Sequence, residues 1–205
     1  YGYIRRLLKT EDLHMRHICW NYYNALSEEA VDAIRDACLE EELVEGVVSD
    51  TSSDEFVEKP DIRRSKISLL NKRQHVGIYN LMFEYALNCN QHAYGFDIRS
   101  IEDCQFGVYD SKDEGFYDWH IDTLWGNSKM SDRKISMVMQ LSSRDEYEGG
   151  EFELKNVNFS EEDKARLKNK GAILTFPSFL EHRVRPVTKG KRLSLIAWVE
   201  GNKFR

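Results

Sequence analysis

Residues 171–199 have the sequence GAILTFPSFLEHRVRPVTKGKRLSLIAWV, in which three apolar, β-branched runs alternate with turn-forming residues. Runs of this length and composition are typical of β-strands. Seven of them follow one another after residue 100, at 104–109, 117–121, 134–141, 151–154, 172–176, 182–187 and 193–199. Short strands in such close succession predict a mainly β fold, either an antiparallel sandwich or a jelly roll.

Helices are predicted mainly before this β region. Ser27 is a good helix cap because two glutamates follow it at the positive end of the helix dipole, and the helix should end before Gly46. Residues 69–90 carry apolar side chains at helical spacing, and Gly95 is a suitable stop. A short third helix is predicted after Ser160, in the manner of a capping box. We expect the helices to pack outside the β core.

The length of 205 residues fits a single domain. Within it, we expect residues 1–99 to form a mainly helical support region and residues 100–205 to form the β core. The polar segments 47–60 and 123–133 are predicted to be loops. Whether these loops close over an active site is left open by the sequence.

The composition narrows the partners and the compartment. A net charge of -6 gives no general attraction to phosphate backbones, so a nucleic-acid partner is not expected. The longest apolar runs, such as residues 193–199, are far shorter than the roughly 20 residues that span a bilayer, so no membrane partner is expected either. The 4 cysteines contain no CxxC pair, which favours reduced thiols and a cytoplasmic location.

A candidate metal site begins at His120 and Asp122, which lie two residues apart in a predicted strand. Residues at this spacing leave a strand on the same face, so both side chains can reach one point. A third ligand, His182, begins another predicted strand. Two histidines and one carboxylate leave three coordination positions open, which is the arrangement of non-haem Fe(II) oxygenases. His-x-Asp alone is a weak motif, and a surface or turn pair would look the same.

Arg192 strengthens the hypothesis because it follows His182 by ten residues. The turn at 186–190 predicts adjacent antiparallel strands that direct His182 and Arg192 into one cavity. Arg192 shares a strand face with Ser194, and a guanidinium beside a hydroxyl suits the distal carboxylate of a dicarboxylate. The alternative for Arg192 is a salt bridge at the rim of the fold. Arg63 and Arg64, after the polar segment, could guide an anionic or peptide substrate, but solvated surface residues are the more common case.

From about Tyr79 onward the chain resembles the prolyl-4-hydroxylase-like Fe(II)/2-oxoglutarate-dependent dioxygenases, and it looks closest to the small microbial and phage-type members. The resemblance rests on five pieces of sequence and two single aromatic residues. They are Tyr109, residues 115–122 (GFYDWHID), 148–151 (EGGE), 171–178 (GAILTFPS), 182–187 (HRVRPV), 190–194 (GKRLS) and Trp198.

The resemblance implies a double-stranded β-helix core packed against the N-terminal helices. It implies Fe(II) held by His120, Asp122 and His182, with Arg192 anchoring the cosubstrate 2-oxoglutarate. The implied reaction uses O2, releases succinate and CO2, and hydroxylates a C–H bond, with ascorbate as a candidate reductant.

Further site residues follow from the same resemblance. Tyr109 matches the tyrosine that lies over the cosubstrate, and the substrate pocket is assigned Tyr117, Trp198 and Arg183. For both tyrosines, ordinary packing in the barrel is an equal alternative. One departure is visible at Met139 and Gln140, where some prolyl hydroxylases place a tyrosine that helps to hold the cosubstrate carboxylate.

The leading substrate is a prolyl residue of a protein or peptide, and a free amino acid or other small molecule stands second. A nucleic-acid demethylase with the same core is disfavoured by the acidic balance. From another class, the alternative is a non-redox metal-binding cupin-like protein, which has no use for a dicarboxylate anchor at Arg192. The oligomeric state and the biological role are left open.

Overall fold

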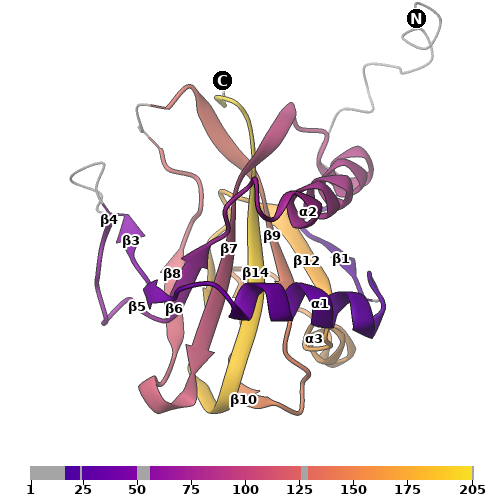
Figure 1. Ribbon diagram of the computed structural model, residues 1–205. Helices are drawn as coiled ribbons and strands as arrows, with labels where there is room; N and C mark the ends of the chain where they lie inside the picture. Colours follow the sequence, from indigo (N-terminus) through magenta and orange to yellow (C-terminus); the bar gives the residue numbers. More distant parts are fainter. Residues whose placement is uncertain (1–16, 24, 50–55, 126–128, 205) are drawn as a thin grey trace, which may run out of the picture.

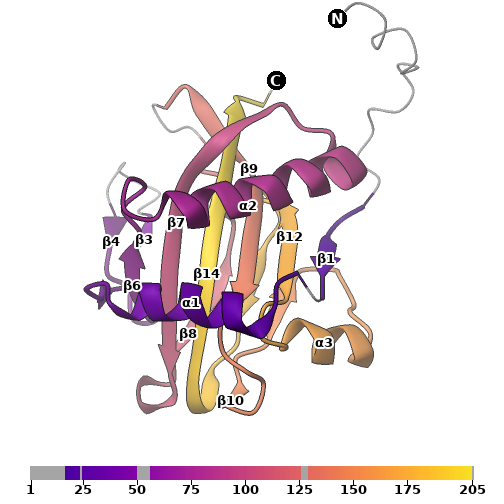
Figure 2. The same ribbon diagram turned by 45° about the vertical axis from the view of Figure 1, so that its right-hand side comes forward.

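The computed structural model describes residues 17–23, 25–49, 56–125 and 129–204. Two antiparallel β-sheets face each other, and two helices cover the larger one (Figures 1 and 2). The first elements in the chain are β1 (Trp20–Tyr22), α1 (Glu28–Leu39), β2 (Val44–Glu45), β3 (Val48–Ser49), β4 (Phe56–Val57), β5 (Arg63–Arg64), β6 (Lys66–Leu69), α2 (Val76–Cys89) and the π-helical turn η3 (Asn90–Tyr94). Then follow β7 (Ile98–Asp110), the 3-10 turn η4 (Ser111–Asp113), β8 (Phe116–His120), β9 (Ser131–Gln140), β10 (Tyr147–Gly149), β11 (Phe152–Leu154), α3 (Glu161–Leu167), β12 (Ile173–Pro177), β13 (His182–Val184) and β14 (Val187–Asn202).

The larger sheet, which we call the major sheet, has the strand order β1-β12-β9-β14-β7-β6-β2, and β10 pairs with β14 beside this path. The minor sheet has the order β11-β13-β8-β5. A separate pair, β3 with β4, comes from the predicted loop at 47–60. The mainly β fold with flanking helices that the sequence predicts is confirmed.

Side-chain alternation along β14 separates the two faces of the major sheet. Leu193, Leu195, Ala197 and Val199 are buried in the main hydrophobic core. The residues between them line the space between the two sheets, namely Arg192, Ser194, Ile196 and Trp198. Successive residues of a strand point to opposite faces, so one strand supplies both the core and the site. The same division holds in β9, where Ile135, Met137 and Met139 join the core.

Helices α1 and α2 cross the outer face of the major sheet and close this core (Figure 2). Helix α1 begins as predicted, because the Ser27 hydroxyl accepts a hydrogen bond from the Ala30 amide at 3.4 Å. It presents Val31, Ile34 and Cys38 to the sheet. Helix α2 starts at Val76, later than predicted, because residues 66–69 join the major sheet as β6. Gly95 ends the following π turn in the left-handed conformation, at φ 67°.

The run at 182–187 was predicted as one strand, but the structure divides it between the two sheets. β13 ends at Val184 in the minor sheet, and β14 starts at Val187 in the major sheet. His182 and Arg192 therefore do not lie on adjacent antiparallel strands, and the hairpin prediction is wrong. Pro186 cannot donate a ladder hydrogen bond, so the chain leaves one sheet there and enters the other.

No helix among the described residues is long and apolar enough to cross a membrane. The four cysteines are free, and three of them are buried.

The two faces of β14 predict different costs of truncation. Leu195→Ala should lower the free energy of unfolding by about 2–5 kcal/mol, because Leu195 is fully buried in the core under the helices. Ile196→Ala should cost less than half as much, since the Ile196 side chain borders a cavity and only part of its contacts are lost. Urea unfolding of both variants measures the difference. Equal losses would contradict the division into a packed face and a cavity face.

Candidate metal centre and active-site cavity

A cavity of about 300 Å³ lies between the two sheets. Its walls include the predicted residues His120, Asp122, His182 and Arg192. Tyr109, Tyr117, Ser194 and Trp198 also line it. The structure therefore brings together eight of the nine residues that the sequence assigned to the site.

His120 and His182 are cross-strand partners, because β8 pairs with β13 and their Cα atoms stand opposite each other. The Nε2 atoms of both rings face the Asp122 carboxylate, at 3.8 Å for His120 and 3.5 Å for His182. One potential ligand atom of each residue lies within 4.8 Å of the other two. An ion with ligand bonds of about 2.1 Å needs neighbouring ligand atoms roughly 3 Å apart. The three side chains therefore need to move only slightly toward one another to bind it.

Backbone carbonyls hold both histidine rings in the orientation that a metal requires. His120 Nδ1 lies 2.8 Å from the Asp118 carbonyl, and His182 Nδ1 lies 2.9 Å from the Leu180 carbonyl. In this geometry Nδ1 carries the proton and donates it, so Nε2 keeps a free lone pair. Burial and the nearby His182 lower the pKa of His120 to about 3, so its imidazole is neutral at physiological pH.

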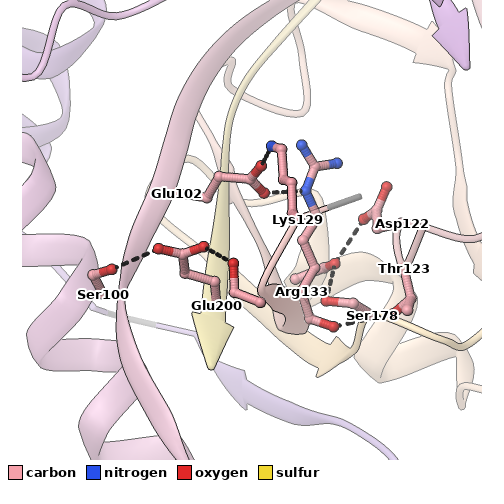
Figure 3. Close-up of polar contacts among 10 residues, drawn as sticks. Ser100, Glu102, Asp122, Thr123, Lys129, Arg133, Ser178 and Glu200 are labelled. Carbon is pink, nitrogen blue, oxygen red and sulfur yellow. Dashed lines mark hydrogen bonds and ion pairs between the residues drawn. The ribbon is translucent and has the colours of Figure 1, made fainter. Parts of the chain in front are cut away.

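Asp122 lies beyond the end of β8, so its position depends on hydrogen bonds more than on the strand pleat. The Asp122 and Thr123 amides both donate to the Ser178 carbonyl, at 2.9 and 3.1 Å. The Ser136 hydroxyl donates to Asp122 Oδ2 at 2.6 Å, and Ser178 lies beside both (Figure 3). Burial acts to raise the pKa of Asp122, but the adjacent His182 and His120 outweigh it and the pKa falls to about 2. The carboxylate is therefore ionised.

The donor atoms of His120, Asp122 and His182 fit a metal ion. Two imidazole nitrogens and one carboxylate oxygen converge, and the other ring nitrogen of each histidine and the Oδ2 atom of Asp122 are already engaged in hydrogen bonds. Such a set on one side of an ion suits Fe(II) with open positions. His120, Asp122 and His182 could therefore hold this metal.

Arg192 is 3% exposed and lies at the other end of the same cavity. Its Nη1 donates to the Ser194 hydroxyl at 3.3 Å, and its guanidinium lies 5.6 Å from the centre of the Tyr109 ring. Among the described residues, none forms a salt bridge with Arg192, so the rim salt bridge is not seen. Burying an unpaired guanidinium is costly, so the position favours an anionic ligand.

Glycine makes room for the Arg192 side chain. Gly150 has φ +62°, and a Cβ there would lie 3.1 Å from Arg192 Cδ and 3.3 Å from the Tyr147 ring. Tyr147 is buried behind Arg192, and its hydroxyl accepts a hydrogen bond from Gln140 Nε2 at 3.2 Å. Gln140, at the point of departure from some prolyl hydroxylases, thus supports a tyrosine that comes from β10. The sequence did not reveal Tyr147, because β10 is only three residues long.

Tyr117 lies against the metal ligands. Its ring stacks on the His120 ring, with centroids 3.5 Å apart and an interplanar angle of 12°. Burial raises the pKa of Tyr117, so its hydroxyl stays protonated and can donate a hydrogen bond into the cavity. Trp198 lines the cavity near the Asp122 end, since it pairs with Ser136 across the sheet.

Arg183 is the one predicted site residue that does not line the cavity. It lies between His182 and Val184, so strand alternation directs it to the opposite face of the minor sheet. There its Nε donates to Glu153 at 2.6 Å, and its guanidinium lies over the Trp119 ring.

The sequence also missed a charged cluster at the mouth of the cavity beyond Trp198. Glu102 accepts hydrogen bonds from Lys129 and from Arg133, the latter at 2.5 Å (Figure 3). Arg133 in turn lies over the Trp198 ring, 4.0 Å from its centre. Lys129 is 57% exposed, whereas the residues around Arg192 are buried, so the cavity opens at this end. Only the alternation of side chains along β7 and β9 could have indicated this cluster. Polar residues at those positions are equally consistent with a solvated face.

Comparison with known proteins places this geometry in a family. The model of the 2OG-Fe(II) oxygenase superfamily matches residues 104–200, which contain all three candidate ligands and Arg192. This segment matches a 2OG-Fe(II) oxygenase domain. Fe(II) and 2-oxoglutarate, predicted from the sequence, are the cofactor and cosubstrate of that superfamily.

Curated relatives of the oxygenase domain include PKHD-type hydroxylases. The protein from Idiomarina loihiensis is 41% identical over 85 residues, which are 42% of this chain and 37% of the relative. The protein from Teredinibacter turnerae is 29% identical over 145 residues, which are 69% of this chain and 58% of the relative. The chain therefore spans well under two thirds of the length of these relatives.

Solved structures share the fold over most of the chain. A viral collagen prolyl hydroxylase from Paramecium Bursaria Chlorella virus-1 has a TM-score of 0.67 at 16% identity, covering 90% of this chain and 97% of that one. A prolyl-4-hydroxylase from Pseudomonas putida has a TM-score of 0.67 at 20% identity, covering 91% and 94%. These structures confirm the double-stranded β-helix core. The resemblance to prolyl-4-hydroxylase-like oxygenases is confirmed by the family model and the PKHD-type relatives together with this shared fold.

The hydrogen bond from Ser136 to Asp122 predicts an effect on metal affinity. Ser136→Ala should weaken Mn(II) or Fe(II) binding by on the order of 10-fold, because the carboxylate loses the bond that orients it. Anaerobic calorimetric titration with Mn(II) measures this. Ser142→Ala is the matched control, since Ser142 is equally buried but bonds only to the backbone of Lys191 and Leu193. Equal affinities of the two variants would show that Ser136 does not orient Asp122.

Proposed function

We propose that this protein is an Fe(II)- and 2-oxoglutarate-dependent dioxygenase that hydroxylates a C–H bond, with release of succinate and CO2. One observation carries the proposal. A His-Asp-His set with free ligand atoms and a buried guanidinium that pairs with no described acid line the same cavity. Either feature alone occurs in other proteins, but together they match a metal-chelating dicarboxylate.

In this proposal His120, Asp122 and His182 hold Fe(II), and Arg192 binds the distal carboxylate of 2-oxoglutarate with help from Ser194. When bound, the iron with its cosubstrate supplies the oxidising chemistry. The chain's own residues position and shield it. The Nδ1–carbonyl hydrogen bonds fix the imidazoles, Ser136 orients Asp122, and the Tyr117 ring covers His120. The hydrophobic cluster of Tyr109, Tyr147, Val184 and Val187 excludes water at the Arg192 end.

The leading substrate is a prolyl residue of a protein or peptide, and we propose it on the likeness to prolyl hydroxylases. One structural neighbour, from Trichoplax adhaerens, is a prolyl hydroxylase in complex with a hypoxia inducible factor peptide fragment. It has a TM-score of 0.68 at 17% identity and covers 89% of this chain and 83% of that one. A free amino acid or another small molecule is the second candidate.

The segments 47–60 and 123–133 each contribute to the cavity wall. Val47, Ser49 and Phe56 line it from the first, and Leu124, Lys129 and Arg133 from the second. The question of loop closure, which the sequence left open, falls partly on residues 50–55 and 126–128, which lie outside the described residues. We also propose that these residues form a single domain. A cytoplasmic location is a further proposal, which the four free thiols support.

Arg192 separates this function from a non-redox metal-binding cupin-like protein. Anaerobic addition of Fe(II) and 2-oxoglutarate should give the weak metal-to-ligand absorption of a chelated 2-oxo acid. Arg192→Gln should raise the 2-oxoglutarate concentration at half-maximal absorption by on the order of 10- to 100-fold, because it loses a charge-assisted hydrogen bond worth about 1.5–3 kcal/mol. Arg185→Gln is the control, since Arg185 is exposed and pairs with Glu153. If Arg192→Gln needs the same 2-oxoglutarate concentration as the unsubstituted protein, Arg192 is not the carboxylate anchor.

The substrate class is tested by incubation with proline-containing peptides beside free amino acids. A substrate should gain the mass of one oxygen, with an equal amount of succinate formed. Asp122→Ala should abolish both signals because the metal loses its only anionic protein ligand. Wild-type rates of succinate formation in Asp122→Ala would refute the ligand assignment.

A further inference from the structure

A second buried guanidinium lines the cavity. Arg63, on the edge strand β5, is only 7% exposed although the sequence suggested a solvated position. Its Nε donates to the Ser65 hydroxyl at 2.8 Å, and its Nη1 donates to the Val47 carbonyl at 2.9 Å. Both acceptors are neutral. Because a guanidinium has five N–H donors, one on Nη1 and two on Nη2 are left over.

No carboxylate among the described residues forms a salt bridge with Arg63. The next residue shows the contrast, since Arg64 points to the other side of the strand and pairs with Glu114 at 3.2 Å. Arg64 is also far more exposed, at 39% of its side chain. The more exposed guanidinium thus has an acidic partner, whereas its buried neighbour has none within the described part of the chain, which is the opposite of what burial alone favours.

The backbone is built around Arg63. A Cβ on Gly46 would lie 2.7 Å from Arg63 Nε and 2.5 Å from Ser65 Oγ, so only glycine allows this approach. The guanidinium also lies over the Tyr117 ring, 4.6 Å from its centre. Since the His120 ring stacks on one face of Tyr117 at 3.5 Å, Arg63 must cover the other face. Arg63 is therefore held one aromatic ring away from the candidate metal ligands.

The charge balance of the cavity points to the missing partner. The described lining residues include four cations and three anions, which are Arg63, Lys129, Arg133 and Arg192 against Glu102, Asp103 and Asp122. Fe(II) and 2-oxoglutarate together add no net charge. Among these described residues one positive charge stays uncompensated, and Lys129 and Arg133 are already paired with Glu102. Because Arg192 is assigned to the cosubstrate, the excess charge lies at Arg63.

We propose that Arg63 binds a carboxylate of the substrate, so that the substrate is an acid and its affinity depends on that charge. The inference rests on the proposed oxygenase function and deepens it. The carboxylate sits beside Tyr117, on the side of its ring away from His120, while the reacting C–H bond reaches the metal centre. Two sources carry this chemistry, namely the carboxylate of the hydroxylated residue itself and an acidic side chain next to it in a peptide.

The experiment compares acids with their uncharged amides by calorimetry on protein loaded with Mn(II) and 2-oxoglutarate under argon, so that no turnover is needed. N-acetyl-L-proline against N-acetyl-L-prolinamide tests the first source. N-acetyl-prolyl-aspartic acid amide against its asparagine counterpart tests the second. In one of the pairs the acid should bind at least 10-fold more tightly than the amide. Arg63→Gln should remove this preference, whereas Arg64→Gln should keep it.

The outcomes separate the two proposals. Failure of 2-oxoglutarate itself to bind refutes the oxygenase function. If 2-oxoglutarate binds but neither acid exceeds its amide, or neither compound of either pair binds, the role of Arg63 is overturned. Persistence of the preference in folded Arg63→Gln overturns it equally. The acid-to-amide ratio of the unsubstituted protein stands as a test even where Arg63→Gln does not fold.

Discussion

The pairing register of β8 with β13 is the constraint on which the candidate site depends. It sets His120 directly opposite His182, on the face that looks toward the major sheet. A slip of β13 by one residue would turn the His182 imidazole away from His120, because side chains alternate between faces. Contacts on both sides of the histidine pair hold this pairing register. Val184 stands opposite Tyr117, and the Leu180 and Asp118 carbonyls engage the two Nδ1 atoms.

The stability of the fold is concentrated on the other side of the molecule. Leu193, Leu195, Ala197 and Val199 face the helices, while the cavity side of the same strand carries a guanidinium and a hydroxyl. Burying Arg192 and Arg63, which pair with no acid that the structure describes, opposes folding, and the apolar face offsets that cost. Helices α1 and α2 therefore support the site without contributing to its wall: no residue of either lines the cavity.

Much of this arrangement could be predicted from the chain. Six of the seven strand runs and the Ser27 and Ser160 caps are local patterns that the structure keeps, so they could be predicted without knowledge of the tertiary fold. The sequence also revealed the main site residues, because metal-binding and anion-binding residue types occur there in a fixed order. They are His120, Asp122, His182 and Arg192. Local patterns do not report which sheet a strand joins. This is why the crossing from β13 to β14 at Pro186, the pairing of β10 and the burial of Arg63 were missed. Arg63, Ser65 and Ile67 do alternate as one buried face. This alternation was not recognised in the sequence because Arg63, Arg64 and Lys66 are charged.

The cavity has a direction that follows from its electrostatics and its walls. Arg192 lies among buried aromatic and aliphatic residues, whereas Lys129 and the paired Glu102 and Arg133 lie at the open end. Trp198 and Arg192 both lie on β14, so a dicarboxylate that came in beside Lys129 and Arg133 would pass Trp198 before it reached Arg192. Arg63 and Arg192 form no salt bridge with any described residue, and they lie at different places in one cavity. Each can therefore take a different anion, since one small anion cannot satisfy both.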